Sequence, residues 1–159
     1  MIPEQFLEMS KTYRLLSELE PAQLRKLLPL AEEKEFNAGR LIFREGDKSS
    51  FLHLIVSGEV ALEMVVDGEN VRVQTLHAGD AMGWSAIVAD SRTHFQACAL
   101  TPVSTVAFPS DRIREACERD PEVGYALMKR LLELVTERLD ATRMQLVQAI
   151  REPETARQR

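Results

Sequence analysis

Cysteine and basic charge are both scarce in this sequence. Its 159 residues include two cysteines, Cys98 and Cys117, and no Cys-x-x-Cys pair, which excludes a disulfide framework. Acidic residues outnumber basic ones by 25 to 20, and the net charge of -5 disfavours nucleic-acid binding, which needs clustered Lys and Arg. No apolar run approaches the roughly 18 residues that span a membrane, and the first residues lack the pattern of a signal peptide. We therefore expect one cytoplasmic domain.

Catalytic and metal-binding patterns are also missing. The sequence has no recognisable Ser-His-Asp set, Cys-His pair or GxxxxGK phosphate loop, so we expect no enzymatic activity. Its three histidines, His53, His77 and His94, include no His-x-His pair and no carboxylate at a matching offset, which argues against a metal site. His53 lies in an apolar run and is expected to be a core residue.

Glycine, by contrast, is concentrated in one part of the chain. Six of the seven glycines occur between residues 39 and 83, where they separate short runs rich in Val, Ile, Leu and Phe. The strongest turn signal is Asp67-Gly68, because both central residues of a type I′ turn need positive φ. Strands with turns this close together indicate a barrel or sandwich. We predict a mainly β fold with flanking helices, an eight-stranded β-roll of jelly-roll type (a double-stranded β-helix) over residues 35–109.

Helical periodicity flanks the predicted roll. Apolar residues recur at helical spacing between residues 10 and 34, so we place the N-terminal helices within residues 1–34. After the roll, residues 110–150 are predicted to form a short helix with Ser110 as N-cap and a long helix that begins at Asp120-Pro121. The polar tail, residues 151–159, is predicted to be disordered.

The long helix has two apolar flanks. We assign the flank made by Leu127, Leu131 and Leu134 to the body of the roll. On the other flank, successive residues are separated by four and three positions in turn, as a two-stranded coiled coil requires. We assign this flank to contact with a second copy of the chain. This seam consists of Met128, Leu132, Val135, Leu139, Thr142, Leu146 and Ala149. We predict a homodimer, with packing of the whole helix against its own chain as the alternative.

Two segments, AGRLIFREGD (residues 38–47) and LHLIVSGEVAL (residues 52–62), are accompanied by Gly79-Asp80, Gly83 and the long C-terminal helix. Together they resemble the cyclic nucleotide-binding domain of the catabolite-activator and Fnr-like (Crp/Fnr) regulator family. The resemblance covers roughly residues 12–148. It implies a β-roll and a ligand that is cAMP, cGMP or another small anion.

In that family a phosphate-binding cassette binds the cyclic phosphate; it resembles a Gly-Glu start followed, after a short helix and loop, by an Arg and a small residue. The resemblance implies helix N-terminal amides and an Arg for the phosphate, and a Glu that accepts a bond from the ribose hydroxyl. Here the cassette spans residues 83–94 (GWSAIVADSRTH) and departs from the family pattern. Trp84 stands at the Glu position, and its indole N–H only donates. Thr93 stands at the Arg position, with Arg92 one residue earlier, and His94 stands at the small-residue position.

The candidate ligand-binding residues come from this cassette and from the long helix. They are Gly83, Trp84, Ser85, Ala86, Arg92, Thr93, His94 and Arg138. Each has a structural alternative: Trp84 stacks on a ligand or fills the pocket, and Ser85 binds a ligand or caps the cassette helix. Arg92 binds an anion at the amides of the cassette or is a surface side chain. Arg138 reaches the pocket or is a solvated partner of nearby acids.

We predict a single-domain ligand sensor that signals through the long helix to a partner protein. Two other interpretations stay open. One is a ligand-free dimerisation or adaptor module whose pocket is filled by Trp84. The other is an indirect transcription regulator that pairs with a full-length relative. Direct DNA binding is not expected, because only nine residues follow Ile150 and no recognition helix is present.

Overall fold

Two four-stranded antiparallel sheets form the β-roll of the computed structural model, which describes residues 10–151. The first sheet has the strand order β1-β8-β3-β6 and the second has the order β2-β7-β4-β5. The strands are β1 (Glu32–Phe36), β2 (Leu41–Phe43), β3 (Phe51–Ser57), β4 (Val60–Val66), β5 (Glu69–Leu76), β6 (Ala81–Met82), β7 (Gln96–Ala99) and β8 (Val103–Pro109). Side chains of both sheets, such as Ile55 and Leu62, share one buried cluster. The predicted eight-stranded, mainly β roll is confirmed.

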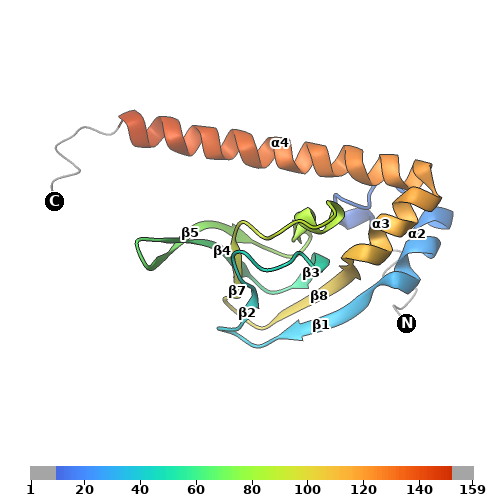
Figure 1. Ribbon diagram of the computed structural model, residues 1–159, viewed down its shortest axis with the longest axis horizontal. Helices are drawn as coiled ribbons and strands as arrows, with labels where there is room; N and C mark the ends of the chain where they lie inside the picture. The colour runs from blue at the N-terminus through green and yellow to red at the C-terminus, as the bar shows by residue number, and fades with distance from the viewer. Residues whose placement is uncertain (1–9, 152–159) are drawn as a thin grey trace.

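Helices flank the roll in sequence and in space. They are the 3-10 helices η1 (Ser10–Thr12), η2 (Leu28–Leu30) and η3 (Trp84–Ile87) and the α-helices α2 (Pro21–Leu27), α3 (Ser110–Arg119) and α4 (Pro121–Arg151). In Figure 1, α4 runs over the whole roll, and the segment that contains η3 lies beneath its middle. No helix within residues 10–151 is both long and apolar enough to cross a membrane.

The N-terminal boundary differs from the sequence-based prediction. The helices end at Leu30 instead of residue 34, and β1 begins at Glu32. Residues 13–19 form turns and bends instead of a helix. The strand was missed because β1 is an edge strand with the charged sequence EEKEF, which has no apolar alternation to distinguish it from helix.

Two details at the C-terminal side also differ. Ser110 is the first residue of α3 and not its N-cap, which is Pro109. Arg151 is the last residue of α4, so the predicted tail does not begin there. The rest of that tail, residues 152–159, lies outside the described residues. The short helix and the long helix themselves are confirmed within one residue of their expected starts.

One flank of α4 packs against the roll as predicted. Leu127 is fully buried, and Leu131 and Leu134 pack against the same cluster. That cluster joins the N-terminal segment, α2, α3 and the outer face of the first sheet, which contributes Leu54 and Phe108. The helices are therefore held to the roll by a second apolar core, to which the first half of α4 contributes.

The other flank of α4 is exposed. Leu132 is 66% exposed and Leu139 is 47% exposed, although both are large apolar side chains. The remaining seam residues are exposed as well: Met128, Val135, Thr142, Leu146 and Ala149. This arrangement is consistent with the predicted dimer seam, and dimerisation itself stays a prediction.

His53 lies inside the roll, as expected from its apolar run. It is 4% exposed, and its Nδ1 lies 3.1 Å from Thr105 Oγ1 on the neighbouring strand β8. The rings of Phe36 and Phe51 flank it. Burial, with a smaller contribution from the positive charge of Lys34, lowers the pKa of His53 to about 4.

Burial of His53 predicts a specific acid sensitivity. Below pH 6.5 the unfolded chain binds a proton at this histidine and the folded chain does not, so acid favours unfolding. Between pH 6.5 and about 4 the free energy of unfolding should fall by about 3 kcal/mol from this group alone. Urea unfolding at pH 7 and pH 4.5 measures how far the free energy of unfolding falls in the native chain and in His53→Gln. The His53→Gln variant should lack the part of the fall that comes from this histidine. His77→Gln, at an exposed site, should retain it; an equal loss in all three proteins would contradict the prediction.

Candidate ligand-binding site

The cassette starts at a backbone position that requires glycine. Gly83 has a φ of 72°, and a Cβ there would lie 2.6 Å from the carbonyl oxygen of Phe51. This left-handed residue is the N-cap of η3 and turns the chain from β6 into the helix. Trp84 is the first residue of η3, so Gly83 places the indole between the roll and α4.

Arg138 of α4 lies on the indole of Trp84. Its Cζ is 3.9 Å from the centroid of the ring, which is a close cation–π contact. Within residues 10–151 the guanidinium makes no ion pair or hydrogen bond. The alternative that Arg138 pairs with nearby acids is not found, because these acids have other partners: Glu137 binds Arg14, Glu133 binds Arg130, and Asp140 lies near Arg143. Burial lowers the pKa of Arg138, an effect that Asp80 opposes.

Six candidate residues line one small cavity beside η3. They are Gly83, Trp84, Ser85, Thr93, His94 and Arg138, with Phe43, Leu62, Met82 and Phe95 as apolar neighbours. The cavity volume is about 30 Å³, close to the volume of one water molecule in the liquid. The indole of Trp84 is half-buried and packs against the helical core cluster. In this conformation the cavity beside η3 is far smaller than a nucleotide, and a neighbouring cavity of about 240 Å³ shares Phe43, Gly83 and Thr93 with it.

Arg92 and Thr93 have opposite orientations, as neighbours on an extended chain do. Thr93 is buried, and its hydroxyl donates to the carbonyl of Arg44 at 2.5 Å. Arg92 is exposed, and its guanidinium donates to the carbonyl of Gly46 at 2.8 Å. The structure therefore places Arg92 outside the cavity, and the position that faces inward is held by a neutral hydroxyl.

Ser85 and Ala86 are already hydrogen-bonded. The Ser85 hydroxyl lies 2.6 Å from the Ser49 hydroxyl, and η3 has no side-chain cap, so the prediction that Ser85 caps this helix was wrong. The Ala86 amide donates to Gly83, and the Ala86 carbonyl accepts a 2.8 Å bond from Arg114 of α3. Ser49 and Arg114 were not found from the sequence, because neither belongs to a motif.

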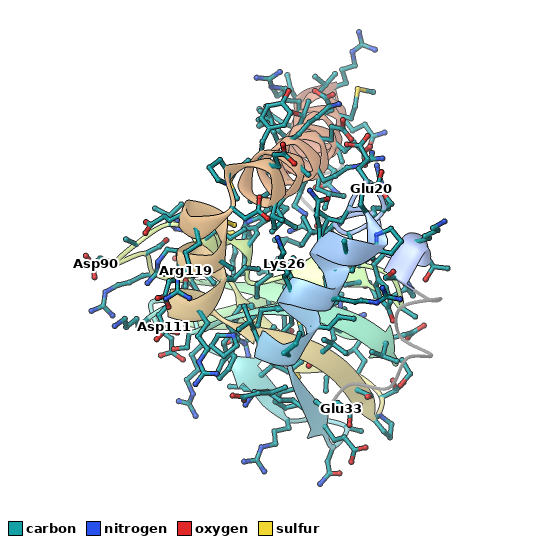
Figure 2. The ribbon with its side chains drawn as sticks, turned by 90° about the vertical axis from the view of Figure 1, so that its right-hand side faces the viewer. Glu20, Lys26, Glu33, Asp90, Asp111 and Arg119 are labelled. Carbon is teal, nitrogen blue, oxygen red and sulfur yellow. The ribbon has the colours of Figure 1, made fainter. Side chains whose placement is uncertain are left out.

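A larger cavity is remote from the cassette. It measures about 520 Å³ and lies among α2, α3 and the start of α4, at the end of the molecule seen in Figure 2. Lys26 and Arg119, labelled there, come from α2 and α3. Both are paired, Lys26 with Asp120 at 3.1 Å and Arg119 with Glu115 at 2.5 Å. Its charged rim is therefore largely neutralised by its own side chains.

No metal site is found in the described part of the chain. Residues 10–151 contain no group of three or more His, Cys, Asp or Glu side chains arranged to hold an ion. His77 is near one carboxylate, with its Nε2 3.7 Å from Glu59, and His94 lines the small cavity.

Comparison with known proteins identifies the family. Residues 33–120 match the model of the cyclic nucleotide-binding domain. The chain belongs to this family. It is 30% identical over 107 residues to the "Global nitrogen regulator" of Synechococcus elongatus, which is 65% of this chain and 48% of that protein. The chain spans about half the length of the curated relatives that it matches.

Two further members of the cyclic nucleotide-binding family show how widely the resemblance extends. The "CRP-like cAMP-activated global transcriptional regulator" of Mycobacterium tuberculosis is 25% identical over 133 residues, which is 83% of this chain and 58% of that protein. The solved cyclic nucleotide-binding domain of Methylobacillus flagellatus superimposes with a TM-score of 0.79 at 20% identity, covering 92% of this chain and 83% of that one. At that identity the second match shows the fold alone. The predicted family is confirmed.

Proposed function

We propose that this chain is a regulatory module that senses a small anionic ligand, with cAMP and cGMP as the first candidates, and signals through α4. Family membership and the cAMP-activated relative from M. tuberculosis support this ligand class. The contact between Arg138 and Trp84 is the main observation behind the proposal. Because it joins α4 directly to the cassette, any movement of the cassette changes what α4 packs against.

The proposed mechanism is a population shift between a closed and an open cassette. The closed state has a cavity of about 30 Å³, whereas typical ligand pockets measure about 300–1,000 Å³. Ligand binding therefore requires Trp84 to leave the pocket and to separate from Arg138. Arg92 would exchange the carbonyl of Gly46 for the anion, which is a stronger, charge-assisted partner.

The output of this sensor is a change at the exposed seam of α4. We infer that a second copy of the chain covers the seam from Met128 to Ala149, and that a partner protein reads the resulting dimer. A shift of α4 by ligand would alter the packing of both copies together. The cytoplasm is the compartment that fits such a signalling module.

A second candidate function follows from the same small cavity. If Trp84 permanently fills the pocket, the chain is a ligand-free dimerisation or adaptor module. The half-buried indole, packed on the core cluster and covered by Arg138, favours this alternative. The two functions differ in one measurable property, the response of the cassette to cyclic nucleotides.

Tryptophan emission distinguishes them, because Trp84 is the only tryptophan in the chain. Titration with cAMP and cGMP should give a saturable change in emission. The melting temperature should rise, since a ligand at about one hundred times its Kd adds about 2.7 kcal/mol of stability. Arg92→Ala should weaken the affinity at least tenfold, because it removes a charge-assisted bond of about 1.5–3 kcal/mol.

The controls separate the parts of the proposal. Lys48→Ala removes a neighbouring exposed cation and should leave the affinity for cyclic nucleotide unchanged. Unchanged affinity in Arg92→Ala would refute the role of Arg92 as the anion-binding residue. No response of emission or melting temperature to either nucleotide would refute sensing of cAMP and cGMP, and would favour the adaptor or a ligand that is not a nucleotide.

A further inference from the structure

The cavity among α2, α3 and the start of α4 lies outside the proposed nucleotide site. Its volume of about 520 Å³ is within the usual range of ligand pockets, about 300–1,000 Å³. It lies at the end of the molecule that faces the viewer in Figure 2, where α2 and α3 carry the labelled Lys26 and Arg119. None of its described lining residues belongs to the cavities of about 30 and 240 Å³ that adjoin Gly83 and Trp84. It is therefore a separate place at which a ligand can bind.

One face of α3 forms a wall of this cavity. Its lining residues are separated by three or four positions, as residues on one side of a helix are: Arg112, Glu115, Ala116 and Arg119. Ala116 is the smallest of these residues, and its single methyl group leaves room in the middle of the wall. A larger side chain at this position would occupy part of the cavity.

The floor of the cavity is apolar and belongs to the helical core cluster. Leu27 and Val123 are each 1% exposed, and Leu30 and Ala116 pack against the same cluster. The nine described lining residues comprise these four apolar side chains and five ionisable ones, with no neutral polar side chain among them. A sugar or a base needs neutral donors and acceptors, which this lining does not offer. The lining instead favours a ligand with an apolar body.

Five charged side chains surround this floor, and four of them form two ion pairs. Lys26 Nζ lies 3.1 Å from Asp120 Oδ2, and Arg119 Nη2 lies 2.5 Å from Glu115 Oε1. The fifth side chain, Arg112, is exposed, and its guanidinium makes no ion pair or hydrogen bond with the rest of the described chain. The cavity therefore has an excess of one positive charge, which Arg112 carries.

This charge pattern selects the class of ligand. A cation would meet three basic side chains, and a neutral ligand would gain no charge-assisted bond from Arg112. A single negative charge matches the excess. A carboxylate is the anion that suits it best, because its two oxygens accept two parallel hydrogen bonds from a planar guanidinium.

We propose that this cavity binds a small carboxylic acid with an apolar body, such as a medium-chain fatty acid or an arylalkanoic acid, in its ionised form. The carboxylate binds Arg112 at the rim, and the apolar body lies on Leu27, Leu30 and Val123. The bound acid contacts α2, α3 and the first turn of α4 at the same time. It therefore stabilises the packing of three helices whose contacts meet at Asp120.

The test is a calorimetric titration of the purified chain with octanoate and with 3-phenylpropanoate. We expect at least one of these acids to bind one-to-one with a dissociation constant below about 1 mM and to raise the melting temperature. The alcohol and the amine of the same carbon skeleton, which have a neutral and a cationic head group, should bind at least tenfold more weakly. Absence of binding by both acids, or equal binding of the alcohol, would overturn the proposal.

Two substitutions locate the acid in this cavity. Arg112→Gln removes the charge at an exposed position and should weaken the affinity for the acid at least tenfold. Ala116→Leu fills the middle of the α3 wall with a good helix former and should cause a similar loss, with α3 still folded by circular dichroism. Arg25→Gln, which removes an exposed cation of α2 that does not line the cavity, is the matched control and should have no effect. Unchanged affinity in Arg112→Gln would also overturn the proposal.

This site and the proposed nucleotide site succeed or fail separately, because they share no described lining residue. Arg92→Ala should weaken binding of cyclic nucleotide only, and Arg112→Gln should weaken binding of the acid only. A chain that binds one of the two acids and ignores cAMP and cGMP would retain this site and refute sensing of those nucleotides. A chain that binds only a nucleotide would do the reverse.

Discussion

Replacing Gly58 by alanine should destabilise the fold more than the same substitution at any other glycine of the chain. Gly58 has a φ of 94°, in the left-handed region that costs an L-residue about 1–2 kcal/mol. The new Cβ would overlap the carbonyl oxygen of Pro102 and lie 2.9 Å from Val103 Cα. Overpacking of this kind costs about 1–3 kcal/mol. We therefore expect a total loss of about 2–5 kcal/mol and a melting temperature lower by roughly 10 °C.

Gly68→Ala is the matched control for this prediction. Gly68 has a φ of 80° in the Asp67-Gly68 turn, and a Cβ there would meet no atom within 4 Å. The Gly68→Ala variant should therefore lose only about 1–2 kcal/mol, which is what the left-handed backbone conformation costs an L-residue. Urea unfolding of both variants measures the difference, which isolates the contact with residues 102–103. Equal losses in the two variants would show that this close approach of two turns is not important for stability.

The double substitution Leu132→Glu and Leu139→Glu should convert the chain from dimer to monomer. Both side chains are exposed on one chain and would be buried by the partner, so two unpaired charges per chain would be desolvated in the dimer. We expect the dissociation constant to rise about a thousandfold, or by about 4 kcal/mol. Sedimentation equilibrium measures the mass, and circular dichroism should show that the monomer remains folded.

Met144→Glu provides the control for the seam. Met144 is also exposed on α4, at 60%, and it is not a seam residue. This substitution adds a charge to the same helix and should leave the dimer intact. A monomeric native chain, or a double variant that still dimerises, would refute the assignment of the seam to a second copy.

The roll was predictable because its turns are chemically specific. Asp67 and Gly68 both have positive φ, as the type I′ hairpin requires, and the apolar runs between glycines became strands. The strand β1 was missed, since its charged sequence shows neither the alternation of a strand nor the periodicity of a helix. A strand at the edge of a sheet is defined by its partner, here β8, and local sequence does not contain that information.

Six of the eight candidate residues line one cavity, but the sequence did not predict the directions in which their side chains point. The sequence indicated that Trp84 and Thr93 replace the family's Glu and Arg, and both line the small cavity. It left open whether Arg92 faces the cavity, because neighbouring side chains on an extended chain point to opposite faces and the alignment with the family pattern is uncertain by one residue. The partner of Arg138 was also open, since three acids lie within five residues of it in sequence. A cavity of about 240 Å³ is lined by residues of the N-terminal segment, β5, η3 and α4, and only the folded chain brings these four segments together.

The short connection between α3 and α4 links two helices that both contact the cassette. A single residue, Asp120, separates the two helices, and a Cβ on Gly124 would lie 2.9 Å from the carbonyl oxygen of Cys117, so the two helices pack closely at the joint. Arg114 of α3 holds the carbonyl of Ala86, and Arg138 of α4 lies on Trp84. The four residues of η3 are thus in contact with both helices, α3 and α4. We expect a displacement of this short helix to reach α3 through Arg114 and α4 through Arg138 at the same time.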